Sequence, residues 1–222
     1  MSGGQGGFNY LSEIRRCSFA HPTPVAPIVF SAKIIKIRLA KANMKEIERY
    51  RGCLLGLAVG DAVGTTLEFK QPGSFTPIED MVGGGPFGLK PGQWTDDTSM
   101  ALCLAESLIQ RKGFDPLHQL ETYCRWWREG HLSSTGRCFD IGNTTANALW
   151  DFKRTGEPYR SNLDPWTAGT GSIMRLGPVP LFYAGNPQEA IEKAGESSRT
   201  RHPVAVAVDD CRYVGGLIVG AV

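Results

Sequence analysis

Apolar side chains recur every three or four residues in several segments from residue 44 onward, which is the spacing that gathers them on one face of an α-helix. In the segment that begins at Thr95, for example, Met100, Leu104 and Leu108 share such a face. On the same basis, helices are predicted over residues 45–59, from Thr95 onward, over 116–129, after Thr145 through Ala148 and Trp150, over 187–196 and from His202–Pro203 onward.

Two of these segments bear on the fold class. The helix over 116–129 is expected to turn four side chains inward, those of Leu117, Leu120, Cys124 and Trp127. The run VAVAV at 204–208 alternates as a strand would, but helical spacing continues after it through Tyr213, Leu217 and Ile218. Because every other predicted element is helical, the predicted fold class is all-α.

A line of glycines marks the helix over 45–59. Gly52, Gly56 and Gly60 lie four residues apart, a spacing that predicts close packing of this face against another helix of a soluble bundle. Asp61 follows between Gly60 and Gly64, and we expect it to end the helix in the interior of the protein. A carboxylate in that position needs a hydrogen-bonding or charged partner.

Two segments are rich in glycine and lack a helical pattern. Residues 65–93 form a long loop, which is typical either of a functional segment or of a flexible surface excursion. The segment AGTGSIMR at 168–175 is a loop of small residues whose backbone N–H groups could approach a phosphate closely.

The tripeptide Thr95-Asp96-Asp97 places three oxygen donors at the start of a predicted helix. Thr95 is of a type favoured as an N-cap, and the helix dipole favours the two carboxylates that follow, so both are expected to stay ionised. Acidic residues in a first helical turn are also ordinary capping chemistry. Oxygen donors of this kind equally suit magnesium or manganese, so the tripeptide is a candidate metal-binding element.

Composition narrows the class of protein. The six cysteines among the 222 residues show no metal-ligand spacing, and we expect reduced thiols. Residues 1–43 hold six basic side chains and one acidic one, a formal charge of +5, which leaves −3 of the net +2 for the remainder. A mildly acidic body argues against nucleic-acid binding. No apolar run reaches the length of a membrane span, so a cytoplasmic protein without a membrane partner is expected.

Residues 1–43 differ in character from the rest, being glycine-rich at first, then proline-containing, then basic. We expect a disordered or non-native extension, with the domain running from Met44 to Val222. An acid-poor leader containing arginine and serine is also a feature of mitochondrial transit peptides, which leaves that alternative open.

Four segments, in this order along the chain, resemble the ADP-ribosylglycohydrolase family. They are RGCLLGLAVGDAVGTTLEF at 51–69, PGQWTDDTSMAL at 91–102, FDIGNTT at 139–145, and GTGSIMRLGPVPL at 169–181 with SSRTRHP at 197–203. The resemblance implies a compact orthogonal helical bundle with a two-metal centre, usually magnesium or manganese. It also implies hydrolysis of the bond that joins ADP-ribose to a protein side chain or a related acceptor, so the expected partner is an ADP-ribosylated protein or small ADP-ribose conjugate.

The same resemblance assigns residues. Thr95, Asp96 and Asp97 match metal ligands, whereas Glu68 and Asp140 match acids that act in catalysis. The positions matching the substrate-binding loop and cleft are Gly169, Gly171, Ser172, Met174, Arg175 and His202. Neither the acceptor, arginine or serine or another group, nor the oligomeric state follows from the motifs.

The chain departs from the family pattern in three places. Thr170 stands where asparagine is common, and Arg201 separates Thr200 from His202. The family's second metal motif, of the type Asp-Thr-Asp-Thr, is not reached before Val222, so we expect a bundle incomplete at its C-terminal end. Three hypotheses remain: a hydrolase or a piece of one, an inactive remnant or ADP-ribose-binding module, and an unrelated helical protein whose motifs serve capping and packing.

Overall fold

The computed structural model describes residues 44–159 and 168–222, and the predicted extension at 1–43 lies outside these ranges. The described residues form helices joined by loops, and the nearest approach to a sheet among them is an isolated antiparallel bridge between Gly84 and Leu89. The elements are α3 (Met44–Gly64), η2 (Thr65–Leu67), α4 (Asp96–Arg111), α5 (Pro116–Glu129), α6 (Asn143–Thr155), η4 (Thr170–Ser172), α7 (Pro178–Phe182), α8 (Pro187–Arg199) and α9 (Ala205–Ala221). The predicted all-α class is confirmed.

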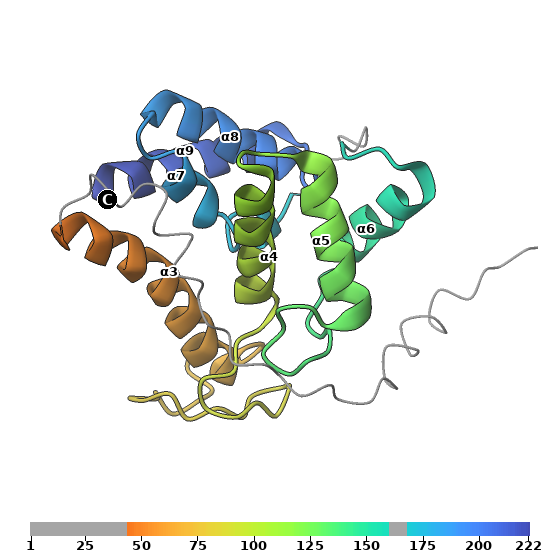
Figure 1. Ribbon diagram of the computed structural model, residues 1–222. Coiled ribbons are helices and arrows are strands. Elements are labelled where there is room, and N and C mark those ends of the chain that lie inside the picture. The colour runs from red at the N-terminus through yellow and green to blue at the C-terminus, as the bar shows by residue number, and fades with distance from the viewer. Residues whose placement is uncertain (1–43, 160–167) are drawn as a thin grey trace, which may run out of the picture.

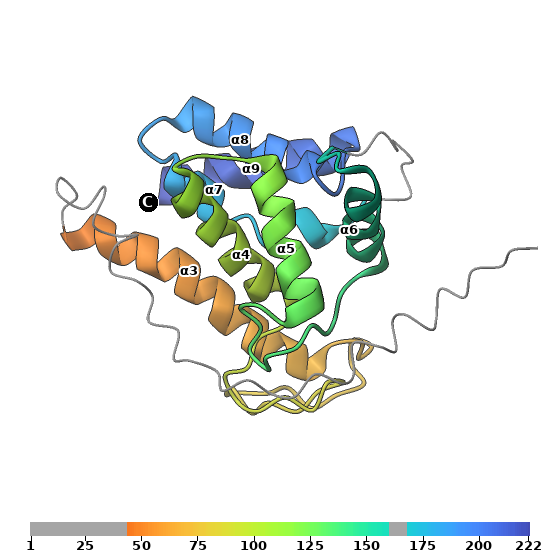
Figure 2. The same ribbon diagram turned by 45° about the vertical axis from the view of Figure 1, so that its right-hand side comes forward.

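The helices pack in two groups that meet at α4. Helices α4 and α5 stand side by side, with α6 on the outer side of α5 (Figure 1). Helices α8 and α9 pack together across one end of this pair, and α7 joins them to α4 (Figures 1 and 2). Helix α3 slants along the opposite flank, so that its C-terminal end and the loop after it lie beside the start of α4.

The core lies where α4 faces α5, α7 and α9. Met100, Cys103 and Leu104 of α4 have no exposed surface, because their three- and four-residue spacing holds them on one face. That face meets buried side chains from the other helices, among them Leu120, Tyr123, Trp126, Val179, Ala194 and Cys211. The apolar stripe predicted for α4 is therefore its core face.

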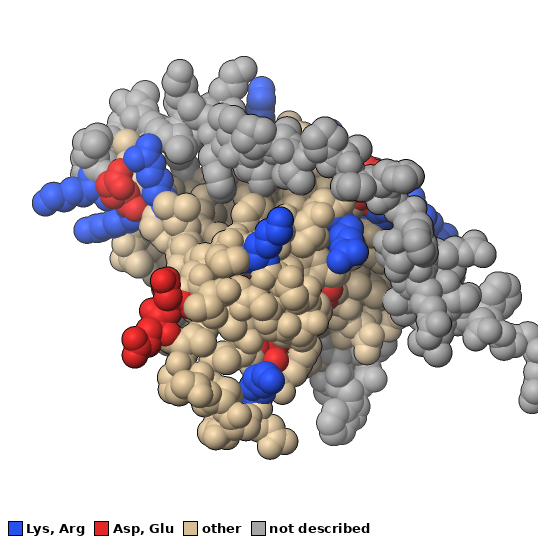
Figure 3. Space-filling view, turned by 90° about the horizontal axis from the view of Figure 1, so that it is seen from below, with Lys and Arg blue, Asp and Glu red and all other residues tan. Residues whose placement is uncertain are grey.

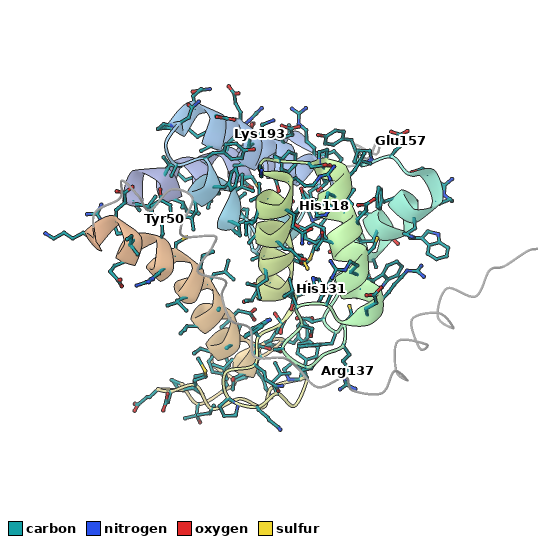
Figure 4. All side chains as sticks on the ribbon, in the orientation of Figure 1. Tyr50, His118, His131, Arg137, Glu157 and Lys193 are labelled. Atoms are coloured by element: carbon teal, nitrogen blue, oxygen red, sulfur yellow. The ribbon has the colours of Figure 1, made fainter. Side chains whose placement is uncertain are left out.

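Polar contacts supplement the apolar core between α4 and α5. His118 Nδ1 lies 2.9 Å from Ser107 Oγ, and His131 Nε2 lies 2.5 Å from Glu106 Oε2. Figure 4 shows these two histidines at different heights along the helix pair. The hydrogen bond from His131 is the main reason why the pKa of Glu106 lies below its ordinary value. The contacts fix the orientation of α4, whose first turn carries the candidate metal ligands.

The inward face of α5 begins later than predicted. Leu117 is 47% exposed, whereas Leu120 and Cys124 are buried. In the first turn the inward position belongs to Gln119, which has no exposed surface and donates to the hydroxyl of Tyr123 at 3.1 Å. The hydrogen bonds available to Gln119 let a polar side chain hold a core position that the apolar pattern assigned to leucine.

Helix α9 also differs from the prediction. It begins at Ala205 with Val204 as N-cap, so Pro203 precedes the helix and does not occupy its first turn. Tyr213 and Leu217 are mostly exposed, and the face packed on α8 consists of small residues. A Cβ added at Gly215 would lie 2.8 Å from the Cβ of Ala194, so small size on both sides allows the two helices to approach closely.

The glycine line of α3 does not form the predicted helix contact within residues 44–159 and 168–222. A Cβ added at Gly52, Gly56, Gly60 or Gly64 would meet nothing within 4 Å. Helix α3 instead approaches α7 through another face, where Leu57 and Cys53 lie against Gly177. The helix also continues to Gly64, so Asp61 lies inside its last turns and does not end it.

The described residues contain no membrane-spanning helix, and the face shown in Figure 3 carries no basic patch. None of their helices is long and apolar enough to cross a bilayer. On the face shown in Figure 3, the basic and acidic side chains are scattered and do not gather into one patch of either sign.

Candidate functional site

The start of α4 is held by a carboxylate from α3. Asp61 accepts hydrogen bonds from the backbone N–H of Thr95 at 3.0 Å and of Thr98 at 3.1 Å. It also accepts from the hydroxyls of the same two threonines, at 2.8 Å and 2.7 Å. These four donors are the partners that Asp61 was expected to need.

This arrangement corrects the predicted cap. Thr95 has the extended backbone of an N-cap, but its side chain makes no capping hydrogen bond. Its hydroxyl instead donates to Asp61, and Asp61 accepts from the N–H of Thr98, the group that an N-cap side chain would otherwise satisfy. The consequence is that α3 and α4 are joined at the point where the predicted metal ligands lie.

The pKa values of the two acids that follow Thr95 are both raised, so that at neutral pH Asp97 stays mostly ionised, as expected, whereas Asp96 is mostly protonated. Burial, with the nearby charges of Asp140 and Asp97, raises the pKa of Asp96 to about 8. Burial, with the charges of Asp61 and Glu68, raises the pKa of Asp97 to about 6. Burial and neighbouring acids outweigh the favourable helix dipole, because both effects act against the charged form.

The two predicted catalytic acids lie near the same place. Asp140 comes from the loop before α6 and has a left-handed backbone, with φ of 58°. Its carboxyl hydrogen-bonds that of Asp96, and burial together with the charges of Glu68 and Asp97 raises its pKa to about 7. Burial, with a smaller contribution from Asp61, also raises the pKa of Glu68. The structure thus brings five acids from α3, η2, α4 and the α5–α6 connection into one acidic centre: Asp61, Glu68, Asp96, Asp97 and Asp140.

The predicted substrate loop is built on two buried arginines. The carbonyl oxygen of Gly171, in η4, accepts from Arg175 Nε at 3.1 Å and from Arg201 Nη1 at 2.6 Å. Arg175 has no exposed surface, and it also donates to the Tyr123 hydroxyl and the Ser197 carbonyl. In this structure its guanidinium supports the loop from the interior.

The other residues matched to this loop lie around the same turn. Ser198 Oγ donates to Ser172 Oγ and to the carbonyl oxygen of His202, both at 3.0 Å. The ring of His202 is almost fully buried, and its Cε1 would lie 3.4 Å from a Cβ added at Gly169. Met174 is partly buried and packs on the core. The matched residues therefore lie around one turn, and the side chains of Ser172 and Arg175 are paired mainly with residues of α5 and α8.

Arg201 links this loop to the acidic centre and was not among the predicted site residues. Burial and the charge of Arg175 lower its pKa to about 9, while the charges of Asp96 and Asp97 raise it. Its guanidinium occupies the space where a Cβ on Gly171 would lie, at 2.3 Å. The insertion of Arg201 before His202 was visible in the sequence, and so was the unusual position of Asp61, but neither feature identifies its contacts.

The oxygen donors of Thr95, Asp96 and Asp97 are of the kind that bind a divalent cation, but too few of them converge to hold one. The oxygens of Thr95, Asp96 and Asp97 are those that magnesium and manganese prefer, and a cation would offset the charge repulsion that raises three of the pKa values. Within residues 44–159 and 168–222, however, no three acidic, histidine or cysteine side chains converge closely enough to hold an ion. The described residues would therefore offer only some of the ligands that a metal ion needs, and the metal site stays a prediction.

An open groove of about 520 Å³ borders the acidic centre at Glu68. Its walls come from the end of η2 and the loop after it, namely Thr66, Glu68, Phe69, Lys70, Gly85 and Pro86. A smaller hollow of about 170 Å³ between α5 and α6 contains none of the predicted site residues. The groove is the concave surface that the candidate site offers to a ligand.

The described residues form an all-helical bundle that places clustered carboxylates next to a glycine-containing loop. The sequence profile described as ADP-ribosylglycohydrolase matches residues 42–222, and the chain belongs to this family. A solved structure titled "ADP-ribosylglycohydrolase-related protein complex" has a TM-score of 0.67 at 42% identity, covering 77% of this chain and 55% of that one.

Known proteins that are similar in sequence to this chain carry names from the same family. The chain is 44% identical over 174 residues to the ADP-ribosylarginine hydrolase Tri1 of Serratia proteamaculans, covering 78% of this chain and 47% of the relative. Identity to the protein of the same name from Pseudomonas putida is 48% over 168 residues, covering 76% and 45%. The ADP-ribosyl-[dinitrogen reductase] glycohydrolase of Rhodospirillum rubrum is 32% identical, covering 77% and 57%. The chain spans about half the length of these relatives.

Proposed function

We propose that the chain carries the acidic half of a metal-dependent hydrolase that cleaves the glycosidic bond between ADP-ribose and a protein side chain. The observation that supports this most is the acidic centre, because acids from four separate segments, all partly or fully buried, lie together beside an open groove. Such crowding of carboxylates is unfavourable in a purely structural site, whereas a hydrolase can use it.

The reaction needs a water whose oxygen bonds to C1 of the distal ribose, and a proton for the group that leaves C1. Asp140 suits this proton exchange, because a pKa of about 7 lets it both hold and release a proton near neutral pH. Glu68 borders the groove and is the second acid that can orient the water. Arg201 and Arg175 hold the loop at Gly171, which would position the ribose and phosphates.

Thr95, Asp96 and Asp97 would hold magnesium or manganese, with further ligands from outside the described residues. When bound, such an ion supplies Lewis-acid polarisation of a ribose hydroxyl or a water. Protein ligands in this first turn are already fixed in place by Asp61, which joins α3 to α4.

Arginine is the acceptor that we propose. Two relatives at 44% and 48% identity are named ADP-ribosylarginine hydrolases, and the carboxyl group of Glu68 in the groove wall suits a guanidinium leaving group. The substrate would then be a protein ADP-ribosylated on arginine, or a small conjugate of the same kind.

A hydrolysis assay tests the proposal. The purified chain is incubated with peptides ADP-ribosylated on arginine or on serine, with Mn²⁺, Mg²⁺ or a chelator, and released ADP-ribose is measured by chromatography. We expect release from the arginine peptide with either ion, no release with chelator, and a loss of at least about 100-fold in Asp140→Asn. Glu189→Gln on the exposed start of α8 is the matched control. Release that is independent of metal, or unchanged in Asp140→Asn, contradicts the proposal.

A second candidate is an ADP-ribose-binding module without hydrolysis. It is favoured by the finding that the described acids do not by themselves form a complete set of metal ligands. Calorimetric titration with ADP-ribose separates the two: binding without release of ADP-ribose from either peptide supports the module, and binding with release supports the hydrolase.

A further inference from the structure

Three phenylalanine rings lie in a row beside the acidic centre. The rings of Phe69 and Phe87 are 6.4 Å apart and nearly perpendicular, at 74°, and those of Phe87 and Phe139 are 5.3 Å apart at 59°. We call these three residues the aromatic row. Two of its members adjoin the predicted catalytic acids in sequence, since Phe69 follows Glu68 and Phe139 precedes Asp140.

Phe69 is held in a way that packing does not explain. It is 77% exposed, the highest value among the exposed large apolar side chains, and its backbone is left-handed with φ of 61°. A bulky residue rarely adopts this conformation, because its side chain crowds the backbone. An exposed ring on a strained backbone gains little for the fold, so the combination points to a ligand.

The groove defines what kind of ligand would meet this ring. Phe69 and Glu68 line the groove together, and the charges of Glu68 act on Asp97 and Asp140 behind it. Lys70 is the basic residue among the lining side chains. A cation that stacks on the face of Phe69 would have the carboxyl group of Glu68 in the same groove wall, which is a setting in which a planar guanidinium binds both a ring and an acid.

We propose that Phe69, supported by Phe87 and Phe139, is the residue that holds the guanidinium of an ADP-ribosylated arginine and so selects arginine as acceptor. The inference rests on the proposed function and adds to it a specificity-determining residue. A serine acceptor has neither a cation nor a planar group, so it would gain nothing from the aromatic row. An adenine ring stacked on Phe69 is a different use of the same surface, and the test separates the two.

The experiment measures binding of arginine amide, serine amide and ADP-ribose to the whole chain by ligand-observed NMR. Phe69→Leu removes the aromatic face but keeps a β-carbon at the same backbone position, and Phe69→Trp provides a stronger aromatic face. Tyr213→Leu is the control, because Tyr213 is similarly exposed, at 69%, but lies on α9. Thermal unfolding of each variant confirms that it is folded.

We expect the chain to bind arginine amide in preference to serine amide. Phe69→Leu should weaken arginine amide binding by about 2- to 30-fold, and Phe69→Trp should keep or strengthen it, while ADP-ribose binding stays the same. Loss of ADP-ribose binding in Phe69→Leu with unchanged arginine amide binding overturns the inference in favour of adenine stacking. Unchanged binding of both ligands overturns it as well. Failure of the unmodified chain to bind ADP-ribose would instead count against the proposed function.

Discussion

Asp61 is the residue on which the geometry of the candidate site depends most. It accepts four hydrogen bonds from Thr95 and Thr98, both of which are almost fully buried. Replacing it with alanine leaves these donors without acceptors, and we expect a loss of about 2–4 kcal/mol in the free energy of unfolding, measured with urea. Asp61→Asn should lose less, because its amide oxygen still accepts.

Asp209→Ala is the control for this prediction. Asp209 pairs with Arg212 on the exposed side of α9, and its removal should change the free energy of unfolding by no more than about 0.5 kcal/mol. An equal effect of the two alanine variants would show that Asp61 does not hold the start of α4.

The raised pKa of Asp96 predicts that the stability of the fold depends on pH. Its pKa in the folded protein is about 8, against an ordinary value of 3.8, so the folded state binds a proton that the unfolded state releases. The stability linked to this proton is complete below about pH 4 and is lost as the pH rises through about 8. Without divalent cations, we expect the melting temperature to fall by about 5 °C or more between pH 5 and pH 8.

Asp96→Asn should reduce this pH dependence, as measured by calorimetry in the presence of a chelator, and the remainder belongs to Asp97 and Asp140, whose pKa values are about 6 and 7. Asp115→Asn serves as the control, because hydrogen bonds from His118 and Arg111 lower the pKa of Asp115 and its titration lies below this range. The interpretation fails if the melting temperature falls between pH 5 and pH 8 by the same amount in Asp96→Asn as in the unmodified chain.

At the scale of elements, the loop after η2 owes its position to glycine. A Cβ at Gly85, where φ is 67°, would lie 2.4 Å from the carbonyl oxygen of Thr65, and Thr66 Oγ1 donates to the Gly83 carbonyl at 3.1 Å. We expect Gly85→Ala to reduce the free energy of unfolding by about 3 kcal/mol and to weaken ADP-ribose binding, because the groove wall must move.

Gly88→Ala is the matched control for Gly85→Ala. Gly88 has almost the same backbone, with φ of 62°, but open space around it. Its replacement should cost only the strain of the left-handed conformation, about 1 kcal/mol. Similar losses in both variants, by urea unfolding, would mean that the loop does not rest on η2.

Elements with long periodic patterns were predictable, and α5 matches its predicted range of 116–129. The five-residue α7 was missed, because a helix this short has no period to detect. The inward face of α5 was assigned wrongly at Leu117, because spacing shows that an apolar face exists but not which neighbour it meets. The prediction that the glycines of α3 pack against another helix was wrong for the same reason.

At the scale of the whole molecule, the acidic centre exists only because distant segments meet. Motif order in the sequence identified Glu68, Asp96, Asp97 and Asp140 as candidates, and folding brings them into one electrostatic unit. The contacts of Asp61 and Arg201 could not be predicted, because each joins residues about 30 positions or more apart in the chain. Family membership and fold are shown by the comparisons, whereas the roles of these residues remain predictions.

Binding of Mn²⁺ by the unmodified chain tests the central claim most directly. Electron paramagnetic resonance measures the free ion during a titration, in the presence of ADP-ribose. The account predicts that the chain binds Mn²⁺, that Asp96→Asn combined with Asp97→Asn weakens binding at least about tenfold, and that Asp209→Asn has no effect. Equal Mn²⁺ binding in the double variant, or no binding by the unmodified chain, would contradict the assignment of the acidic centre as a metal site.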